Sequence, residues 1–136
     1  MNTWLYQLNA KQWSPKNFRR DIWEGRRWYW EFGQKRGAGS PESGDVIIFY
    51  YAHTGNPDPG VYGWAVVDSL TEDHGLYFTP CGPTNWLKMD PWRSKELVAL
   101  VTAIRGQPQA TLFLVEDRHH VLQLRRGIRK WLAGAD

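Results

Sequence analysis

Apolar residues near the N-terminus follow first a strand-like and then a helix-like spacing. Residues 3–8 (TWLYQL) favour a strand, and the Ser-Pro pair at 14–15 is typical of a helix start. Phe18 and Ile22 then lie four residues apart, as they would on one face of a helix. The pattern predicts a strand followed by a helix over residues 15–23 that packs on a core through this face.

The most apolar run of the chain is the segment 46–52 (VIIFYYA), which has the length of one strand. Because it has no polar face, we expect a strand that is buried on both sides. Residues 61–68 (VYGWAVVD) predict its antiparallel partner after a long loop. Gly63 inside that partner predicts a bulge or a close approach of another segment.

The second half of the chain predicts further strands before a final helix. We expect a short strand over 76–79, a main strand over 96–104 (ELVALVTAI), a short strand within 110–115 (ATLFLV) and a helix over 117–132. Strand runs separated by long loops, without regular strand–helix alternation, predict an α+β fold. Its sheet is expected to have five to six strands and to curve toward a barrel, with helices outside it.

The final helix is predicted to be amphipathic. Its apolar residues recur at helical spacing and are Val121, Leu124, Ile128 and Trp131. Its other side carries the basic residues Arg125, Arg126, Arg129 and Lys130. Gly127 weakens this helix by about 1 kcal/mol relative to Ala.

Length and composition predict one domain over residues 1–136 with an excess of aromatic residues. Nine Trp are more than packing in a core of this size requires, so some are expected to line a surface or pocket. The single Cys81 excludes an internal disulfide framework and favours a reducing compartment. No apolar run approaches the roughly 20 residues of a membrane helix. We expect a cytoplasmic, monomeric protein, whose net charge of +3 is compatible with a polyanionic partner.

The segment 24–33 (EGRRWYWEFG) places Trp28 and Trp30 on one side of an extended chain and Tyr29 on the other. One interpretation is that all three pack in the core. The other is that the two Trp residues stack on a base, because basic residues surround them and basic grooves lined with rings bind splayed nucleotides. The basic residues are Arg26, Arg27, Lys35 and Arg36.

Three stretches of the sequence resemble the EVE domain family. Residues 23–30 (WEGRRWYW) resemble its W-(D/E)-G-x-R-x-Y motif, with matches at Trp23, Glu24, Gly25, Arg27 and Tyr29. Residues 43–67 resemble its segment of Gly-Asp, a hydrophobic run and a Pro-Gly turn into a second strand. Residues 90–101 (DPWRSKELVALV) resemble its aromatic lead into a later strand.

The resemblance implies a PUA-like pseudo-β-barrel related to the YTH domains, which hold a modified base in an aromatic cage. For this chain it implies a module that binds a modified base in DNA or RNA, with Arg26, Arg27, Lys35 and Arg36 on phosphates. The candidate base-contacting aromatic residues are Trp28, Trp30, Trp64, Trp86 and Trp92. The candidate polar partners are Tyr51, His53 and Asn85.

Catalytic chemistry finds little support in the sequence. Cys81 lies in a Pro-Cys-Gly-Pro turn without a legible triad, and His119 and His120 lack the spacing of two metal ligands on a helix. The acids Asp21, Glu24, Glu31 and Asp45 form no assignable pair, and most are expected to be solvated. We expect no catalytic residue, no metal and no cofactor. Two alternatives stay open, namely a small ASCH-type amidohydrolase acting on modified nucleosides and a protein-interaction domain that uses exposed Trp.

Overall fold

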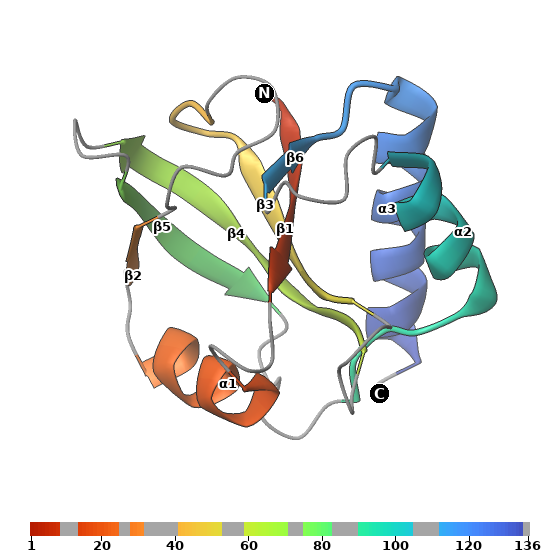
Figure 1. Cartoon of the computed structure of the whole chain (residues 1–136), viewed down its shortest axis with the longest axis horizontal. Coiled ribbons are helices and arrows are strands. Elements are labelled where there is room, and N and C mark those ends of the chain that lie inside the picture. The colour runs from red at the N-terminus through yellow and green to blue at the C-terminus, as the bar shows by residue number, and fades with distance from the viewer. Residues whose placement is uncertain are drawn as a thin grey trace.

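Six strands and three helices make up the described part of the chain, which is residues 1–8, 14–24, 28–31, 41–52, 59–70, 75–82, 90–104 and 112–134 of a computed structural model. In chain order they are β1 (Thr3–Leu8), α1 (Pro15–Glu24), β2 (Trp28–Glu31), β3 (Val46–Tyr51), β4 (Gly60–Leu70), β5 (Gly75–Gly82), α2 (Lys95–Ile104), β6 (Leu112–Leu114) and α3 (Arg118–Ala133). The predicted α+β class is confirmed (Figure 1).

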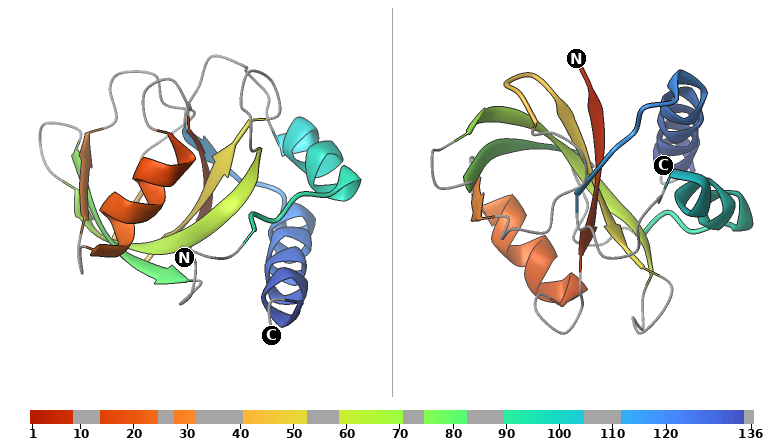
Figure 2. Two further views of the ribbon diagram at one scale, coloured as in Figure 1. Left: turned by 90° about the horizontal axis from the view of Figure 1, so that it is seen from below. Right: turned by 45° about the horizontal axis from the view of Figure 1, so that its top comes forward.

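The strands form one mixed sheet in the order β2-β5-β4-β3-β1-β6. β1 and β3 are parallel, and the other neighbouring strands are antiparallel. Figure 2 shows that the sheet is curved. Among the described residues the order ends at β2 and at β6, so the pairing is that of an open sheet and does not show the predicted closure toward a barrel.

The predicted hairpin of the two central strands is confirmed by the pairing of β3 with β4. Ile47 lies opposite Ala65 and Phe49 opposite Gly63, after which the register shifts. This irregularity lies beside Gly63, as the glycine inside the strand predicted.

Both faces of the central strands are buried, because successive residues of a strand point to opposite faces of the sheet. The inner cluster on one face consists of Trp4, Tyr6, Leu8, Phe18, Ile47, Phe49, Tyr51, Tyr62, Ala65, Val67 and Leu112. The outer cluster on the other face consists of Leu5, Ile48, Tyr50, Val61, Leu97, Leu100, Val101, Phe113, Val115, Leu124 and Ile128. The prediction that β3 is buried on both sides is therefore confirmed.

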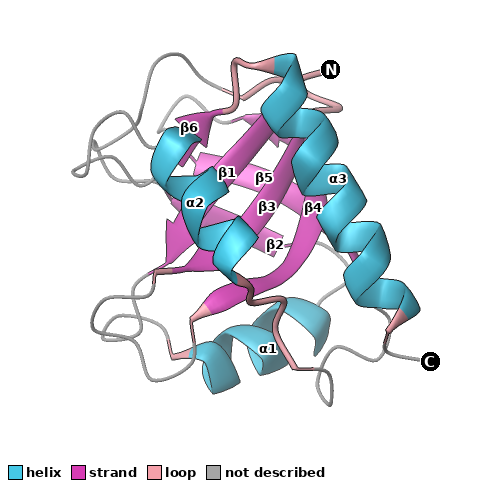
Figure 3. Ribbon diagram, turned by 90° about the vertical axis from the view of Figure 1, so that its right-hand side faces the viewer, coloured by secondary structure: helices cyan, strands magenta, loops and turns pink. Residues whose placement is uncertain are grey.

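The helices cover the two faces of the sheet separately. α1 contributes Phe18 to the inner cluster, whereas α2 and α3 lie side by side on the outer cluster (Figure 3). Ser14 caps α1 by accepting a hydrogen bond from the Asn17 N–H at 3.2 Å, and Asp117 caps α3 by accepting from the His119 N–H at 2.8 Å. No helix in the described part of the chain has the length and apolarity needed to cross a membrane.

The predicted strand over residues 96–104 is wrong, because Lys95–Ile104 form the helix α2. The Ser94 hydroxyl accepts a hydrogen bond from the Leu97 N–H at 3.0 Å and caps the first turn. Leu97, Leu100 and Val101 are then buried at the spacing of one helical face. The segment over residues 90–101 therefore leads into a helix rather than a strand.

Candidate functional site

β2 carries the Trp-Tyr-Trp sequence at one end of the sheet order, where it pairs only with β5 among the described strands (Figure 1). Trp28 lies opposite Phe78 and Trp30 opposite Leu76. Phe78 in turn lies opposite Val67, a member of the inner cluster. The backbone register therefore aligns the Trp28 position with Val67 across three strands. The side chains of Trp28 and Trp30 lie outside the described part of the structure.

Four aromatic rings in tilted and edge-to-face contact hold α1 on the inner face of the sheet. The Phe18 ring lies 5.1 Å from that of Phe49 and 6.0 Å from that of Tyr51, between ring centroids. The Tyr51 and Tyr62 rings are 5.0 Å apart and meet edge to face, a favourable aromatic geometry. This ring cluster therefore fixes α1, the element that precedes the Trp-Tyr-Trp strand in the chain, on the inner face of the sheet.

Tyr51 is a core residue in this structure and not an exposed polar partner for a base. Its side chain is 0% exposed, since β3 is an internal strand covered on both faces. Burial raises the pKa of its hydroxyl, and the neighbouring Tyr62 adds to this effect. The sequence-based assignment of Tyr51 to the base-contacting set is corrected accordingly.

Trp64 and Trp92 both pack on the outer cluster, on the side of α2 and α3. The backbone of Trp92 pairs with that of Val61 through two hydrogen bonds of 2.9 Å, one in each direction. Neither indole lies with the inner cluster, with which the Trp28 position is aligned. We therefore remove Trp64 and Trp92 from the candidate cage.

Gly127 is the place where α3 meets the ring of Trp92. A Cβ atom built on Gly127 would lie closer than 3.0 Å to the ring carbons Cη2 and Cζ2 of Trp92. The Trp131 indole Nε1 also donates a hydrogen bond to the Asp90 carbonyl oxygen, at 2.8 Å. The segment from Asp90 to Trp92 is thus fixed between β4 and α3. Gly127, which weakens the helix, makes room for the Trp92 indole.

Asp45 is buried and organises the start of the sheet, contrary to the expectation that it is solvated. Its carboxylate accepts hydrogen bonds from the Asn2 N–H at 2.8 Å, the Glu42 N–H at 2.9 Å and the Trp4 indole Nε1 at 3.0 Å. Gly44 before it has a φ of 91°, which favours glycine. Gly44 and Asp45, the Gly-Asp pair in the segment that resembles the EVE domain family, therefore have a structural role in this chain.

Replacing Asp45 with Asn should lower the free energy of unfolding at neutral pH by about 1–3 kcal/mol, because the buried N–H donors lose a charged acceptor. Burial by itself raises the pKa of Asp45, but the hydrogen bonds from Asn2, Glu42 and Trp4 outweigh it and lower that pKa below its usual value. The stabilisation is therefore present above the unfolded-state pKa and is lost as the pH falls through the lower folded-state pKa.

Urea unfolding of wild type and D45N between neutral and strongly acid pH measures this effect. The difference between the two proteins should shrink toward acid pH. Glu116→Gln, which removes an exposed carboxylate, is the matched control and should behave as wild type. A D45N protein that is as stable as wild type at neutral pH would contradict the structural role.

Cys81 is the one candidate nucleophile that the sequence offered, and it lies in the described part of the chain. Cys81 is exposed and its Sγ donates to the Thr79 carbonyl oxygen at 3.4 Å. Partial shielding of the sulfur from water raises the pKa of its thiol, with a further contribution from the charge of Asp68, and a protonated thiol is a poor nucleophile. No group of three His, Cys, Asp or Glu residues within the described ranges is placed to hold a metal ion.

Seven of the predicted site residues lie outside the described part of the chain. They are Arg26, Arg27, Lys35, Arg36, His53, Asn85 and Trp86. Their assignments to base or phosphate contacts stay predictions.

Comparison with known proteins gives the fold but no family. No protein-family model matches the sequence, and no curated protein matches it. Three solved structures resemble the chain along nearly its whole length. A hypothetical protein from Leishmania major has 15% identity and a TM-score of 0.57, with 96% of each chain covered. A protein from Rhodopseudomonas palustris has 12% identity and a TM-score of 0.53, with 93% of this chain and 92% of that chain covered. A protein from Pseudomonas putida has 18% identity and a TM-score of 0.52, with 92% and 98% covered.

Proposed function

We propose that this chain is an EVE domain of PUA-like fold that binds DNA or RNA and holds a modified base in an aromatic cage. The observation that supports it most is the placement of the Trp-Tyr-Trp sequence on β2, a strand at the end of the sheet order. Alternate residues of a strand share a face, so Trp28 and Trp30 would provide two neighbouring rings for stacking.

The position of β2 favours binding over packing alone. Among the residues whose side chains are described, the inner cluster draws on β1, β3, β4 and β6 together with Phe18 of α1. β2 lies at the end of the sheet order, pairs with β5 and follows α1 along the chain. A strand anchored in this way gives a rigid platform on which rings can be presented to a ligand.

The candidate cage is now smaller than the one that the sequence predicted. Trp28 and Trp30 form its first wall, and Trp86 is the remaining candidate for a second wall. His53 and Asn85 are the remaining polar partners. The cluster of Arg26, Arg27, Lys35 and Arg36 would contact phosphates beside the base.

The energy of stacking limits the form of the nucleic acid. Stacking on an aromatic side chain contributes about 1–3 kcal/mol per base, and flipping a base out of a duplex costs a few kcal/mol. The stacking energy of one cage therefore offsets about the cost of flipping one base out of a duplex. We expect a single strand, or a duplex with a weakened pair at the modified base, to bind more tightly than a fully paired duplex.

Isothermal calorimetry with a panel of methylated, hydroxymethylated and unmodified DNA and RNA oligonucleotides tests the function. The expected result is that at least one modified oligonucleotide binds about tenfold or more tightly than its unmodified counterpart, a difference of about 1.4 kcal/mol. Equal affinities across the panel would contradict modified-base recognition. Absence of binding to any oligonucleotide at low salt would contradict the nucleic-acid function as a whole.

A further inference from the structure

α3 carries all of the net positive charge of the chain. Five of the 17 Lys and Arg residues lie on this helix, which contains no Asp or Glu. The remaining 12 Lys and Arg are outnumbered by the 14 Asp and Glu elsewhere. The charge is thus strongly asymmetric, although the net value of +3 is modest.

Four of these cations form one exposed surface, which we call the α3 basic face: Arg125, Arg126, Arg129 and Lys130. Within the described residues none of the four forms an ion pair with a carboxylate. The acids that are close in sequence, Glu116 and Asp117, lie at the other end of the helix, where Asp117 is the cap. In the described part of the chain, no carboxylate therefore neutralises the α3 basic face.

The spacing of the α3 basic face suits a phosphate backbone. From residue 125 to residue 130 the helix rises about 7.5 Å, which is close to twice the axial rise of about 3.4 Å per nucleotide of one duplex strand. Arg125 and Arg129, like Arg126 and Lys130, are four residues apart, a spacing at which like charges destabilise a helix. A bound polyanion would remove this repulsion.

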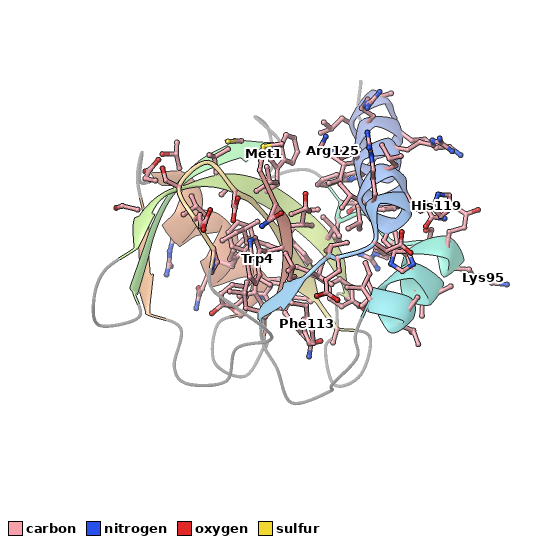
Figure 4. All side chains as sticks on the ribbon, turned by 90° about the horizontal axis from the view of Figure 1, so that it is seen from above. Met1, Trp4, Lys95, Phe113, His119 and Arg125 are labelled. Atoms are coloured by element: carbon pink, nitrogen blue, oxygen red, sulfur yellow. The ribbon has the colours of Figure 1, made fainter. Side chains whose placement is uncertain are left out.

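The opposite side of α3 fixes the orientation of this face. Leu124 and Ile128 are buried in the outer cluster, and Gly127 lies on the Trp92 ring. The cations are exposed and lie off this buried side of α3, and Figure 4 labels Arg125 on the helix. Because the buried side is fixed by packing, charge can be removed from the exposed side without disturbing the core.

The α3 basic face and β2 lie on different sides of the molecule (Figure 1). α3 packs over β1, β3 and β4, whereas β2 lies beyond β5. With strands about 4.8 Å apart and a helix about 10 Å wide, the two sites are on the order of 20 Å apart. That distance corresponds to about six nucleotides of a duplex strand.

We propose that the α3 basic face binds the phosphate backbone of the nucleic acid at a distance from the modified base, without reading its sequence. The inference rests on the proposed function for the identity of the polyanion. It assigns the two tasks to separate surfaces: β2 selects the base, and α3 supplies affinity that depends on salt and on the length of the nucleic acid.

The test compares the salt dependence of binding for wild type and the variant Arg125→Gln/Arg129→Gln, with an unmodified duplex of about 20 base pairs as the probe. Each phosphate contact contributes about 0.9 to the slope of log K against log salt concentration, so the double variant should lose about two units of slope. Gln favours helices as Arg does, and both side chains are exposed, so circular dichroism and melting should stay as in wild type.

The matched control is Lys16→Gln/Lys95→Gln, which removes the same charge from exposed positions on α1 and α2. It should change the slope by less than the α3 variant does. An oligonucleotide of about five nucleotides with the modified base at its centre is too short to reach α3, and wild type and the α3 variant should bind it equally.

The outcomes separate the two proposals. Binding of the long probe with an unchanged slope in the α3 variant, or with equal losses in the variant and the control, would overturn the α3 assignment and leave base selection intact. Loss of slope in the α3 variant without preference for any modified base would support the assignment and contradict the cage. Binding of wild type to anionic vesicles but not to the long duplex would overturn the assignment in favour of a lipid surface.

Discussion

Replacing Gly127 with Ala is expected to destabilise the protein by about 1–3 kcal/mol, although Ala is the better helix former by about 1 kcal/mol. The added Cβ would overlap the ring carbons of Trp92, and that ring has little room to move. The Trp92 backbone is paired with Val61, and the Asp90 carbonyl beside it is bound by the Trp131 indole. The overlap must therefore be relieved by a shift of α3 or of the ring, and either one weakens the outer cluster.

The effect of Gly127→Ala on the free energy of unfolding should have the opposite sign once the Trp92 indole is removed. Trp92→Ala alone should cost about 3–5 kcal/mol of unfolding free energy, as expected for truncation of a large packed side chain. In that background Gly127→Ala has space for its methyl group and should stabilise the protein by up to about 1 kcal/mol. Urea unfolding of wild type, both single variants and the double variant measures this reversal.

Gly134→Ala, at the C-cap of α3, provides the control for adding a methyl group to the same helix. Its Cβ would meet only the Lys130 and Trp131 carbonyl oxygens at 3.6 Å, an ordinary contact. Gly134→Ala should change the free energy of unfolding only slightly, both in wild type and in the Trp92→Ala variant. If Gly127→Ala had the same sign with and without the Trp92 ring, the contact between α3 and Trp92 would not be the reason for the glycine.

Replacing Trp28 or Trp30 with Ala is expected to weaken binding of the preferred modified oligonucleotide by about 1–3 kcal/mol, or about 5- to 150-fold. The melting temperature should change little, because a side chain that stacks on a ligand is not required by the core. Trp92→Ala gives the opposite pattern, with a large loss of stability and no selective loss of affinity. Calorimetry and thermal melting on each variant separate the two behaviours.

Tyr29 is the control on the same strand, because its side chain is expected on the opposite face from Trp28 and Trp30. Tyr29→Ala should leave the ratio of affinities for modified and unmodified oligonucleotides unchanged, whatever it costs in stability. If Trp28→Ala and Trp30→Ala both lowered stability and left that ratio unchanged, the two residues would be packing residues and the cage would be refuted.

The periodicity of apolar residues was sufficient to predict the helices that have one apolar and one polar side or a recognisable capping residue. α1 begins at its Ser-Pro signal and buries Phe18, and α3 buries Leu124 and Ile128 as its spacing predicted. The segment that forms α2 was predicted wrongly because seven of its ten residues are apolar, so a strand and a helix give a similar apolar pattern. Ser94 before it was the available signal for a helix start.

The candidate site was harder to predict because it depends on contacts between distant segments. Nothing in the sequence distinguishes Trp64 and Trp92 from the other Trp residues. Only the tertiary structure places them on the outer cluster. Asp45 accepts from a residue 43 positions away, which no local pattern reveals. Gly127 was the one visible indication, since a glycine in the middle of a good helix points to a close neighbour.

The most direct test of the central claim is a crystal structure of the protein bound to a short oligonucleotide that carries the preferred modified base. We expect the base to be unstacked from its neighbours and to lie against the side chains of the β2 segment, with Trp28 or Trp30 in face-to-face contact with it. A structure in which the base is bound elsewhere, or in which the Trp28 and Trp30 rings are buried in the core without touching the nucleic acid, would contradict the claim.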